Sequence, residues 1–175
     1  MKQTKLKTIA VVSACMMGML SSSAQGVMQR TANYHPDGRG FSCVNGNNRY
    51  TRALYGSVDE WRLETSDRPI FAIFKKNNHR NIRFVIKCNG QAFQLDSVEY
   101  CKARYEAGKR EYLMKDKRWG SGVLKLSVLA YPQTEGAVWK FAAENFGKAK
   151  IVIVGMICET RVSKFKRAGD IGKFD

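Results

Sequence analysis

Short extended segments separated by turn residues run through this chain from Gly40 onward, and hardly any segment keeps a helical period over three turns. Residues 123–131 are typical, because valine and leucine alternate there with lysine and serine until Pro132 ends the run. Roughly ten such segments with no helix between them predict an all-β fold. The expected architecture is a large antiparallel β-sandwich with few or no helices.

The predicted strands follow one another at short intervals. They cover residues 40–44, 49–55, 61–65, 69–74, 82–87, 93–95, 98–105, 110–115, 123–131, 137–144 and 151–157. Asn45-Gly46 and Asn89-Gly90 are pairs that favour tight hairpin turns, so we expect a hairpin at each. Residues 151–157 are a nearly continuous apolar run, which predicts a strand buried on both faces. Residues 160–175 are basic and add no apolar strand, so we expect a truncated C-terminal edge that a partner or a longer chain covers.

The N-terminus has the three-part build of a secretory signal peptide. Three lysines lie among the first seven residues, residues 8–20 form an uncharged and mostly apolar run, and small residues follow up to Ala24. This pattern predicts cleavage after Ala24 and export to the periplasm, the cell surface or the medium. Lipidation at Cys15, as in bacterial lipoproteins, is the alternative. The apolar run is too short to cross a membrane, and no transmembrane segment is expected.

Residues 25–175 are expected to form one β-sandwich domain, because their length suits a single hydrophobic core. The formal net charge of +15 falls to +12 once the three signal-peptide lysines are removed, so the surface is expected to attract anions. Outside the cell the expected partner is a polysaccharide, in particular an acidic one, whereas nucleic acid is excluded by compartment. A basic surface that only aids solubility is the alternative.

Four cysteines remain after cleavage, namely Cys43, Cys88, Cys101 and Cys158. An even number in an exported chain permits two disulfides in three pairings, and buried free thiols are the alternative. Their spacings match no metal-ligand motif and no histidine neighbours them, so no metal site and no cofactor are expected. Both histidines lie in polar, turn-like contexts that are typical of solvated loops, and no catalytic residue is assigned.

Aromatic side chains near arginines are the candidates for binding a saccharide or an anion. A tyrosine or tryptophan ring offers a flat platform for a sugar, and arginine is a forked donor that suits carboxylate or sulfate. The candidate contacts are Asn48, Arg49, Arg52, Tyr55, Arg104 and Trp119, joined by the basic cluster Lys75, Lys76, Arg80 and Arg83. The alternatives are that the aromatic rings belong to the core and that the basic cluster is a solvated turn.

Four separated segments together resemble one known family. They are residues 45–56, Arg68-Pro69, Ala103-Arg104-Tyr105 and residues 164–172. The resemblance is to an uncharacterised N-terminal β-supersandwich domain, of the galactose-mutarotase-like kind, that precedes a six-hairpin glycosidase-type barrel in large exported proteins of polysaccharide-degrading bacteria. The barrel would carry the paired carboxylates of glycoside hydrolysis, so the resemblance implies no catalysis by this chain alone.

These observations lead to three hypotheses. The first is a non-catalytic N-terminal accessory β-sandwich domain of an exported, glycoside hydrolase-like protein, packing against a catalytic domain that lies outside this chain. The second is a free-standing binding module for acidic polysaccharides. The third is a small hydrolase.

Overall fold

The computed structural model describes residues 33–47, 50–56, 61–75 and 78–159. The chain divides into two units, residues 1–32 and 33–175, and the description below concerns the second unit. The predictions on the signal peptide, on Cys15, on the basic C-terminal residues and on Asn48, Arg49 and Lys76 lie outside the described residues.

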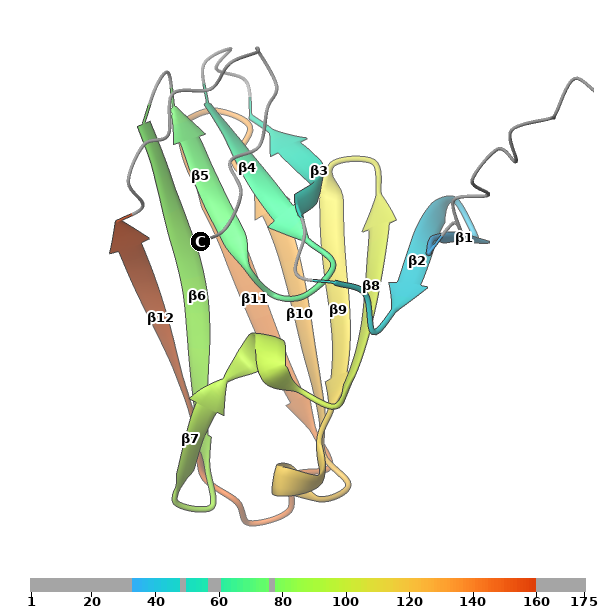
Figure 1. Cartoon of the computed structure of the whole chain (residues 1–175), viewed down its shortest axis with the longest axis vertical. Helices are drawn as coiled ribbons and strands as arrows, with labels where there is room; N and C mark the ends of the chain where they lie inside the picture. The colour runs from blue at the N-terminus through green and yellow to red at the C-terminus, as the bar shows by residue number, and fades with distance from the viewer. Residues whose placement is uncertain (1–32, 48–49, 57–60, 76–77, 160–175) are drawn as a thin grey trace, which may run out of the picture. The chain divides into compact units, whose positions relative to one another are not determined.

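The described residues form twelve strands in two antiparallel six-stranded sheets, which confirms the all-β sandwich (Figure 1). Sheet A has the order β1-β2-β8-β9-β10-β11, and sheet B has the order β12-β6-β5-β4-β3 with β7 beside β6. The strands are β1 (His35–Asp37), β2 (Gly40–Val44), β3 (Tyr50–Tyr55), β4 (Trp61–Ser66), β5 (Phe71–Lys75), β6 (Asn78–Cys88), β7 (Gln91–Gln94), β8 (Tyr100–Glu106), β9 (Lys109–Lys115), β10 (Val123–Ala130), β11 (Ala137–Glu144) and β12 (Ile151–Glu159). Two 3₁₀ turns, η1 (Leu95–Ser97) and η2 (Lys117–Trp119), are the helical elements of this part of the chain.

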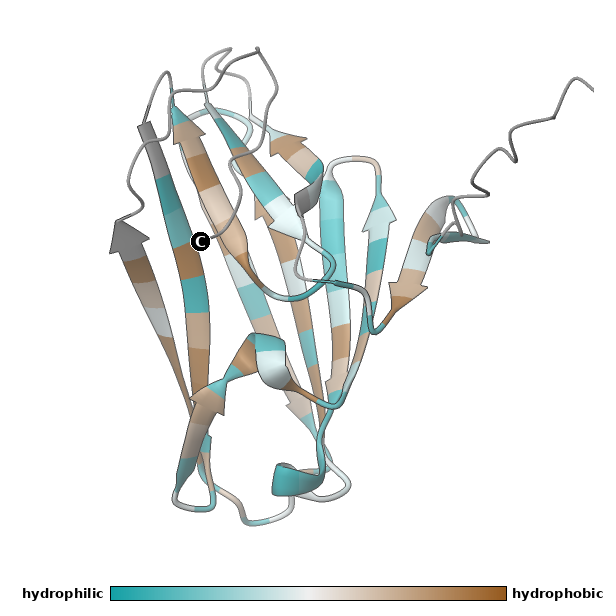
Figure 2. Cartoon of the chain, in the orientation of Figure 1, coloured by the Kyte–Doolittle hydropathy of each residue, from teal (hydrophilic) through white to brown (hydrophobic). Residues whose placement is uncertain are grey.

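The core lies between the sheets and follows from the alternation of the strands, which Figure 2 shows as bands of brown and teal. In β10, Leu124 and Leu126 are fully buried, whereas Lys125 between them is exposed. Phe71 of β5 meets Tyr112 of β9 and Trp139 of β11 edge to face, with ring centroids 5.8 Å apart in both pairs. These aromatic contacts join the two sheets across the core.

The two Asn-Gly pairs have different outcomes. Asn89 and Gly90 have φ values of 49° and 79°, and they close the predicted hairpin between β6 and β7. The hairpin predicted at Asn45-Gly46 is wrong, because β2 belongs to sheet A and β3 to sheet B. Asn45 instead bonds to Cys101 of β8: its backbone N donates to the Cys101 carbonyl, and its side-chain oxygen accepts from the Cys101 N. The Asn45-Gly46 pair therefore follows the end of β2, at the start of the segment that leads to sheet B.

The prediction that residues 151–157 are buried on both faces is also wrong. Within the described residues β12 pairs only with β6, so it forms an edge of sheet B (Figure 1). Ile151 and Ile153 pack against the core, whereas Val152, Val154 and Ile157 are 52%, 48% and 66% exposed. A continuous apolar run is thus placed at the margin of the sheet, where one backbone edge has no neighbouring strand in this part of the molecule.

The described cysteines are buried free thiols. Cys43, Cys88 and Cys101 form no disulfide, and Cys158 lies outside the described side chains. Burial raises the pKa of Cys101 to about 12, so its thiol stays protonated at neutral pH. These three residues act as small core side chains.

Candidate functional site on sheet A

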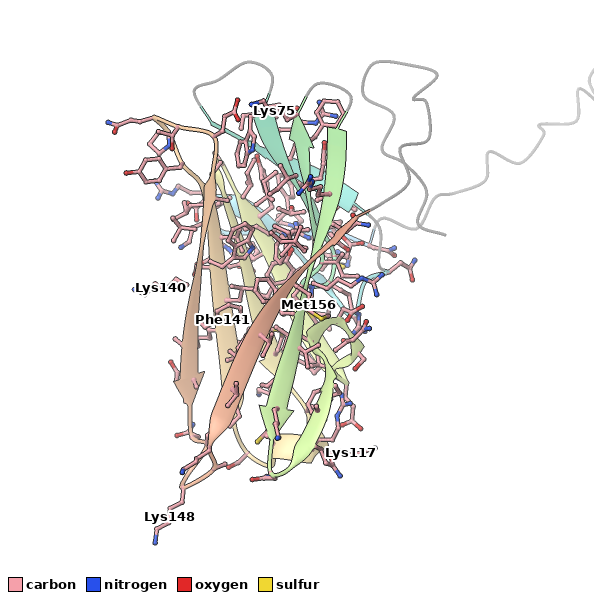
Figure 3. All side chains as sticks on the ribbon, turned by 90° about the vertical axis from the view of Figure 1, so that its left-hand side faces the viewer. Lys75, Lys117, Lys140, Phe141, Lys148 and Met156 are labelled. Carbon is pink, nitrogen blue, oxygen red and sulfur yellow. The ribbon has the colours of Figure 1, made fainter. Side chains whose placement is uncertain are left out.

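A row of polar side chains runs directly across the outer face of sheet A, one from each of five neighbouring strands. The antiparallel register places them opposite one another, and their side chains point away from the core because their neighbours in sequence point inward. The row, called the polar row below, consists of Ser42, Arg104, Glu111, Ser127 and Lys140. Figure 3 shows Lys140 on the outer side of β11 and Phe141 on the side toward the core.

A hollow of about 240 Å³ lies beside the polar row, over strands β8, β9 and β10. Its outward-facing lining residues are Lys102, Arg104, Glu111, Leu113, Lys125 and Ser127. Leu113 lies between Lys102 and Lys125 in the next cross-strand row, so it provides an apolar floor between two cations. The hollow is therefore amphipathic, with one apolar surface and several donors and acceptors around it.

Arg104 is the centre of an ion-pair network at one side of the hollow. Its Nη1 atom lies 2.8 Å from Glu106 Oε2 and 3.1 Å from Glu111 Oε2, and its Nη2 atom donates to the Asp37 carbonyl at 3.3 Å. Hydrogen bonds to Glu106 and Glu111 raise the pKa of Arg104, and the bond from Arg104 lowers the pKa of Glu106. The guanidinium and the Glu106 carboxylate are thus charged, and Arg104 is held in place by its partners.

The lysines around the hollow are paired as well. Lys102 lies 2.9 Å from the Asp37 carboxylate, and the Lys102 hydrogen bond is the main cause that lowers the pKa of Asp37. On the other side, Lys125 lies 2.7 Å from the Glu144 carboxylate. The cations of the hollow therefore have their charge balanced by carboxylates within the same face.

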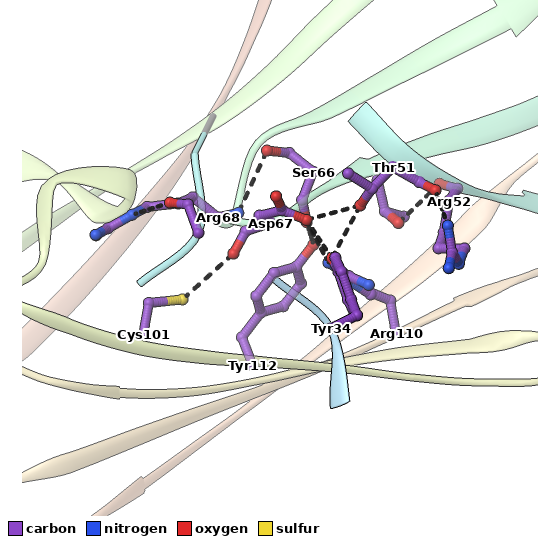
Figure 4. Close-up of polar contacts among 11 residues, drawn as sticks. Tyr34, Thr51, Arg52, Ser66, Asp67, Arg68, Cys101, Arg110 and Tyr112 are labelled. Carbon is purple, nitrogen blue, oxygen red and sulfur yellow. Dashed lines mark hydrogen bonds and ion pairs between the residues drawn. The ribbon is translucent and has the colours of Figure 1, made fainter. Parts of the chain in front are cut away.

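A second polar group, the Arg110 cluster, lies on the inner side of the same strands (Figure 4). Arg110 of β9 is fully buried, and its Nη2 atom donates to the Tyr34 hydroxyl at 2.7 Å and to the Ser66 carbonyl at 2.9 Å. The same atom lies 3.5 Å from Asp67 Oδ1, and the Tyr112 hydroxyl donates to the Ser66 carbonyl at 2.7 Å. The cluster consists of Arg110, Tyr34, Ser66, Asp67 and Tyr112, and it ties the turn after β4 in sheet B to β9 in sheet A.

The chemistry of the Arg110 cluster is structural. Burial raises the pKa of Tyr112, which keeps its phenol protonated as a donor. Burial alone would lower the pKa of Arg110, but interactions with Tyr112 and Tyr34 outweigh it, and the guanidinium stays charged. A protonated phenol and a permanently charged guanidinium hold the two sheets together and provide no general base.

The structure distributes the predicted binding residues over separate places. Arg52 and Tyr55 lie on β3 at one edge of sheet B, and the Arg52 guanidinium is 5.4 Å from the Tyr34 ring centroid. Lys75, Arg80 and Arg83 lie on β5 and β6, where Lys75 pairs with Glu135 at 2.6 Å and Arg83 donates to Gln94 at 3.0 Å. Of the predicted residues that the structure describes, only Arg104 lines the hollow, so the described ones do not form one site.

Trp119 requires a correction. Its side chain is only 4% exposed, its Nε1 atom donates to the Gly122 carbonyl at 3.0 Å, and its ring packs against Phe93 and Phe146. A buried ring offers no platform to a ligand at the surface. The alternative that this aromatic belongs to the core is the one the structure supports.

Sequence reasoning missed Lys102, Glu111, Leu113, Lys125 and Ser127, which line the hollow together with Arg104. Strand alternation already indicates that residues such as Lys125 and Ser127 face outward. The register of β8, β9 and β10 brings these residues together. Two connecting turns and the sheet order determine that register.

The comparison with protein families identifies the later part of the chain. The family designated DUF4450, a domain of unknown function, matches residues 78–174, more than half of the sequence. The chain belongs to the DUF4450 family. The matched residues include β8, β9 and β10 and therefore the hollow on sheet A. Neither curated proteins nor solved structures gave a match.

Within residues 33–159, as far as the structure describes them, no helix has the length and apolar character needed to cross a membrane.

Proposed function

We propose that this DUF4450 chain is a non-catalytic accessory β-sandwich domain of an exported carbohydrate-processing protein, and that β12 packs against a catalytic domain outside this chain. The apolar edge strand β12 is the observation that supports the packing role. The carbohydrate context and the export come from the resemblance and from the signal-peptide pattern, and they are part of the proposal.

The β12 edge has the features of a surface that a neighbour covers. It is nine residues long, and Val152, Val154 and Ile157 are about half exposed or more. No lysine, arginine or proline interrupts residues 151–158, although such residues are the usual protection of an open edge. An uncovered strand of this kind invites pairing with other chains, whereas a second domain that packs on it buries the valines and completes the sheet.

Two carboxylates that pair with cations of the hollow support a non-catalytic role. A glycosidase needs one carboxyl group that stays protonated near neutral pH as a general acid, which requires a raised pKa. The pKa values of Asp37 and Glu106 are instead lowered, because Lys102 and Arg104 hydrogen-bond to them. These two carboxylates are suited to holding cations in place.

The alternative of a free-standing module for acidic polysaccharides remains a prediction from the sequence. The cations around the hollow are balanced by carboxylates, and Lys75 is paired with Glu135. An acidic glycan would have to compete with these internal partners, so the geometry favours the accessory role.

The proposal is tested by reading the gene beyond the codon for Asp175 and expressing the whole open frame. If β12 is covered, its amides exchange with deuterium more slowly in the longer protein than in the 175-residue chain, and only the longer protein releases reducing sugar from polysaccharides. Equal exchange of β12 in both proteins, or a frame that stops at Asp175, would contradict the proposal.

A matched pair of valines sharpens this test. Val154→Lys places a charge on the proposed interface, whereas Val138→Lys places one on β11 in sheet A, and both valines are 48% exposed. In the longer protein, Val154→Lys should restore fast exchange at β12 and increase cleavage between the domains by a protease. Val138→Lys should leave both unchanged.

A further inference from the structure

We infer that the outer face of sheet A binds a neutral saccharide chain that lies across the strands, with one sugar ring in the hollow over β8, β9 and β10. This inference does not rest on the proposed packing of β12, because the face belongs to the other sheet and can be tested on the isolated chain. It assigns a ligand class to a surface to which, among the predicted binding residues that the structure describes, Arg104 alone contributes.

The shape of the site fits a ring with one apolar face. A volume of about 240 Å³ accommodates a monosaccharide unit and leaves its neighbours along the sheet face outside the hollow. The Leu113 side chain at the floor offers the apolar contact that the C–H groups of a sugar ring require. The hollow is open to solvent along the face, so a ring inside a longer chain can enter it.

Hydrogen-bond donors and acceptors follow one another along the polar row, as the hydroxyl groups of a saccharide chain require. Along the polar row a donor, Arg104, is followed by an acceptor, Glu111, and then by Ser127, which both donates and accepts. Neighbouring strands are about 4.8 Å apart, a spacing comparable with the length of one sugar ring. A chain that crosses the strands therefore meets a new polar side chain at each step.

The charge balance indicates a neutral ligand. Arg104 already contacts Glu106 and Glu111, Lys102 contacts Asp37, and Lys125 contacts Glu144. A hydroxyl can donate to one of these carboxylates and accept from its cationic partner without separating the pair. A sugar carboxylate or sulfate would face Glu111 and would have to displace it from Arg104, so acidic glycans are disfavoured despite the net charge of +15.

The internal ion pairs also prepare the site. Side chains that are held before the ligand arrives lose less conformational entropy on binding. Arg104 is fixed by three partners, Glu106, Glu111 and the Asp37 carbonyl. The network thus supplies hydrogen-bonding groups with fixed orientations in a solvated site. Such groups can recognise the positions of the hydroxyl groups on a saccharide.

The experiment titrates the purified 175-residue chain, or its form cleaved after Ala24, with neutral tetra- to hexasaccharides of glucose, xylose, mannose and galactose. Oligogalacturonides of the same length are the acidic comparison. Amide chemical shifts in NMR spectra report affinity and location. We expect at least one neutral series to shift residues of β8, β9 and β10, with an affinity that changes less than twofold between low and high salt.

Two variants locate the site. Ser127→Tyr fills the hollow and should abolish binding, and the milder Ser127→Ala should weaken binding up to about tenfold by removing one hydrogen-bonding group. Ser121→Tyr is the matched control, because Ser121 is exposed in the turn before β10 and outside the hollow, and it should bind as the parent does.

Three outcomes would overturn the inference. They are the absence of binding by every neutral series, binding of oligogalacturonides alone, and neutral binding that Ser127→Tyr and Ser127→Ala both leave intact. None of these outcomes bears on whether β12 is covered in a longer protein, so the two proposals fail separately.

Discussion

Two arginines, Arg104 of β8 and Arg110 of β9, lie on opposite sides of the same pair of strands and show how the surroundings determine what an ion pair does. Both contact carboxylates and backbone carbonyls, but Arg104 is 24% exposed on the outer face, whereas Arg110 is fully buried between the sheets. Water can replace any partner that Arg104 loses. Arg110 has only its protein partners, so the inner cluster serves stability and the outer network remains available for a ligand.

Within the inner cluster, the hydrogen bonds of Arg110 are concentrated on one of its three side-chain nitrogen atoms. The Nη2 atom of Arg110 contacts Tyr34, Ser66 and Asp67, whereas its Nε and Nη1 atoms have no hydrogen-bond partner among the described residues. A guanidinium in this situation depends strongly on the few contacts it has. We therefore expect large effects on stability inside the sandwich and small effects on the outer face.

The largest effect is expected from Arg110→Met. It removes the buried cation and leaves Asp67 without its ionic partner, which should cost about 3–5 kcal/mol in the free energy of unfolding. Urea denaturation followed by tryptophan fluorescence measures the loss. Arg104→Met is the matched control and should be far milder. Equal losses in the two variants would contradict the distinction between the inner and outer networks.

A second prediction concerns Asp116, which pairs with Arg118 and whose side chain is buried although that of Arg118 is partly exposed. Burial alone would raise the pKa of Asp116, but hydrogen bonds from Arg118 and from backbone N–H groups outweigh it and lower the pKa from 3.8 to about 2. A lowered pKa stabilises the fold above the unfolded value, near pH 4, and this contribution is lost as the pH falls through 2. Its size is about 2 kcal/mol.

Asp116→Asn should therefore lower the free energy of unfolding at pH 7 and flatten its decline between pH 4 and pH 2. Urea titrations at several pH values measure both quantities. The parent protein, measured in parallel at the same pH values, is the reference for both quantities. An unchanged slope in Asp116→Asn would show that another carboxylate dominates acid unfolding.

A smaller effect is expected from Tyr112→Phe, which deletes the hydroxyl that bonds to the Ser66 carbonyl. That carbonyl keeps its bond from Arg110, so the loss should be about 1 kcal/mol, as for a single buried hydrogen bond. Tyr100→Phe on the outer face of β8 is the matched control and should lie near zero. A loss several times larger in Tyr112→Phe would mean that the phenol also keeps Arg110 in position.

Much of the sandwich could be predicted from the sequence, because alternation is a local property. The pattern around Leu124 and Lys125 indicates which side of β10 is buried, and Asn89-Gly90 specifies its hairpin through two residues with positive φ. Asn45-Gly46 carries the same signal, yet its bonds to Cys101 connect residues far apart in the sequence. A local motif does not reveal which distant strand will satisfy its backbone groups.

The candidate site was less predictable for the same reason. Arg104 could be selected as a forked donor, and Glu106 follows it by two residues on the same strand, but its partner Glu111 emerges only from the pairing of β8 with β9. The strand at residues 151–157 is a second case in which the sequence did not reveal the position within the sheet. Its apolar composition indicates burial, and only the sheet order reveals that it lies at an edge.

The smallest effect on stability, and the sharpest test of the comparison, is expected from Lys125→Ala at the hollow. The Lys125–Glu144 pair is about half exposed at both side chains, so its loss should change the free energy of unfolding by at most about 0.5 kcal/mol. Because Lys125 lines the hollow, the same variant should weaken binding of neutral oligosaccharides several-fold. Parallel urea denaturation and NMR titration measure the two quantities. A variant that lost stability and kept its affinity would contradict the role assigned to the outer face. Lys125 would then stabilise the fold without contributing to ligand binding.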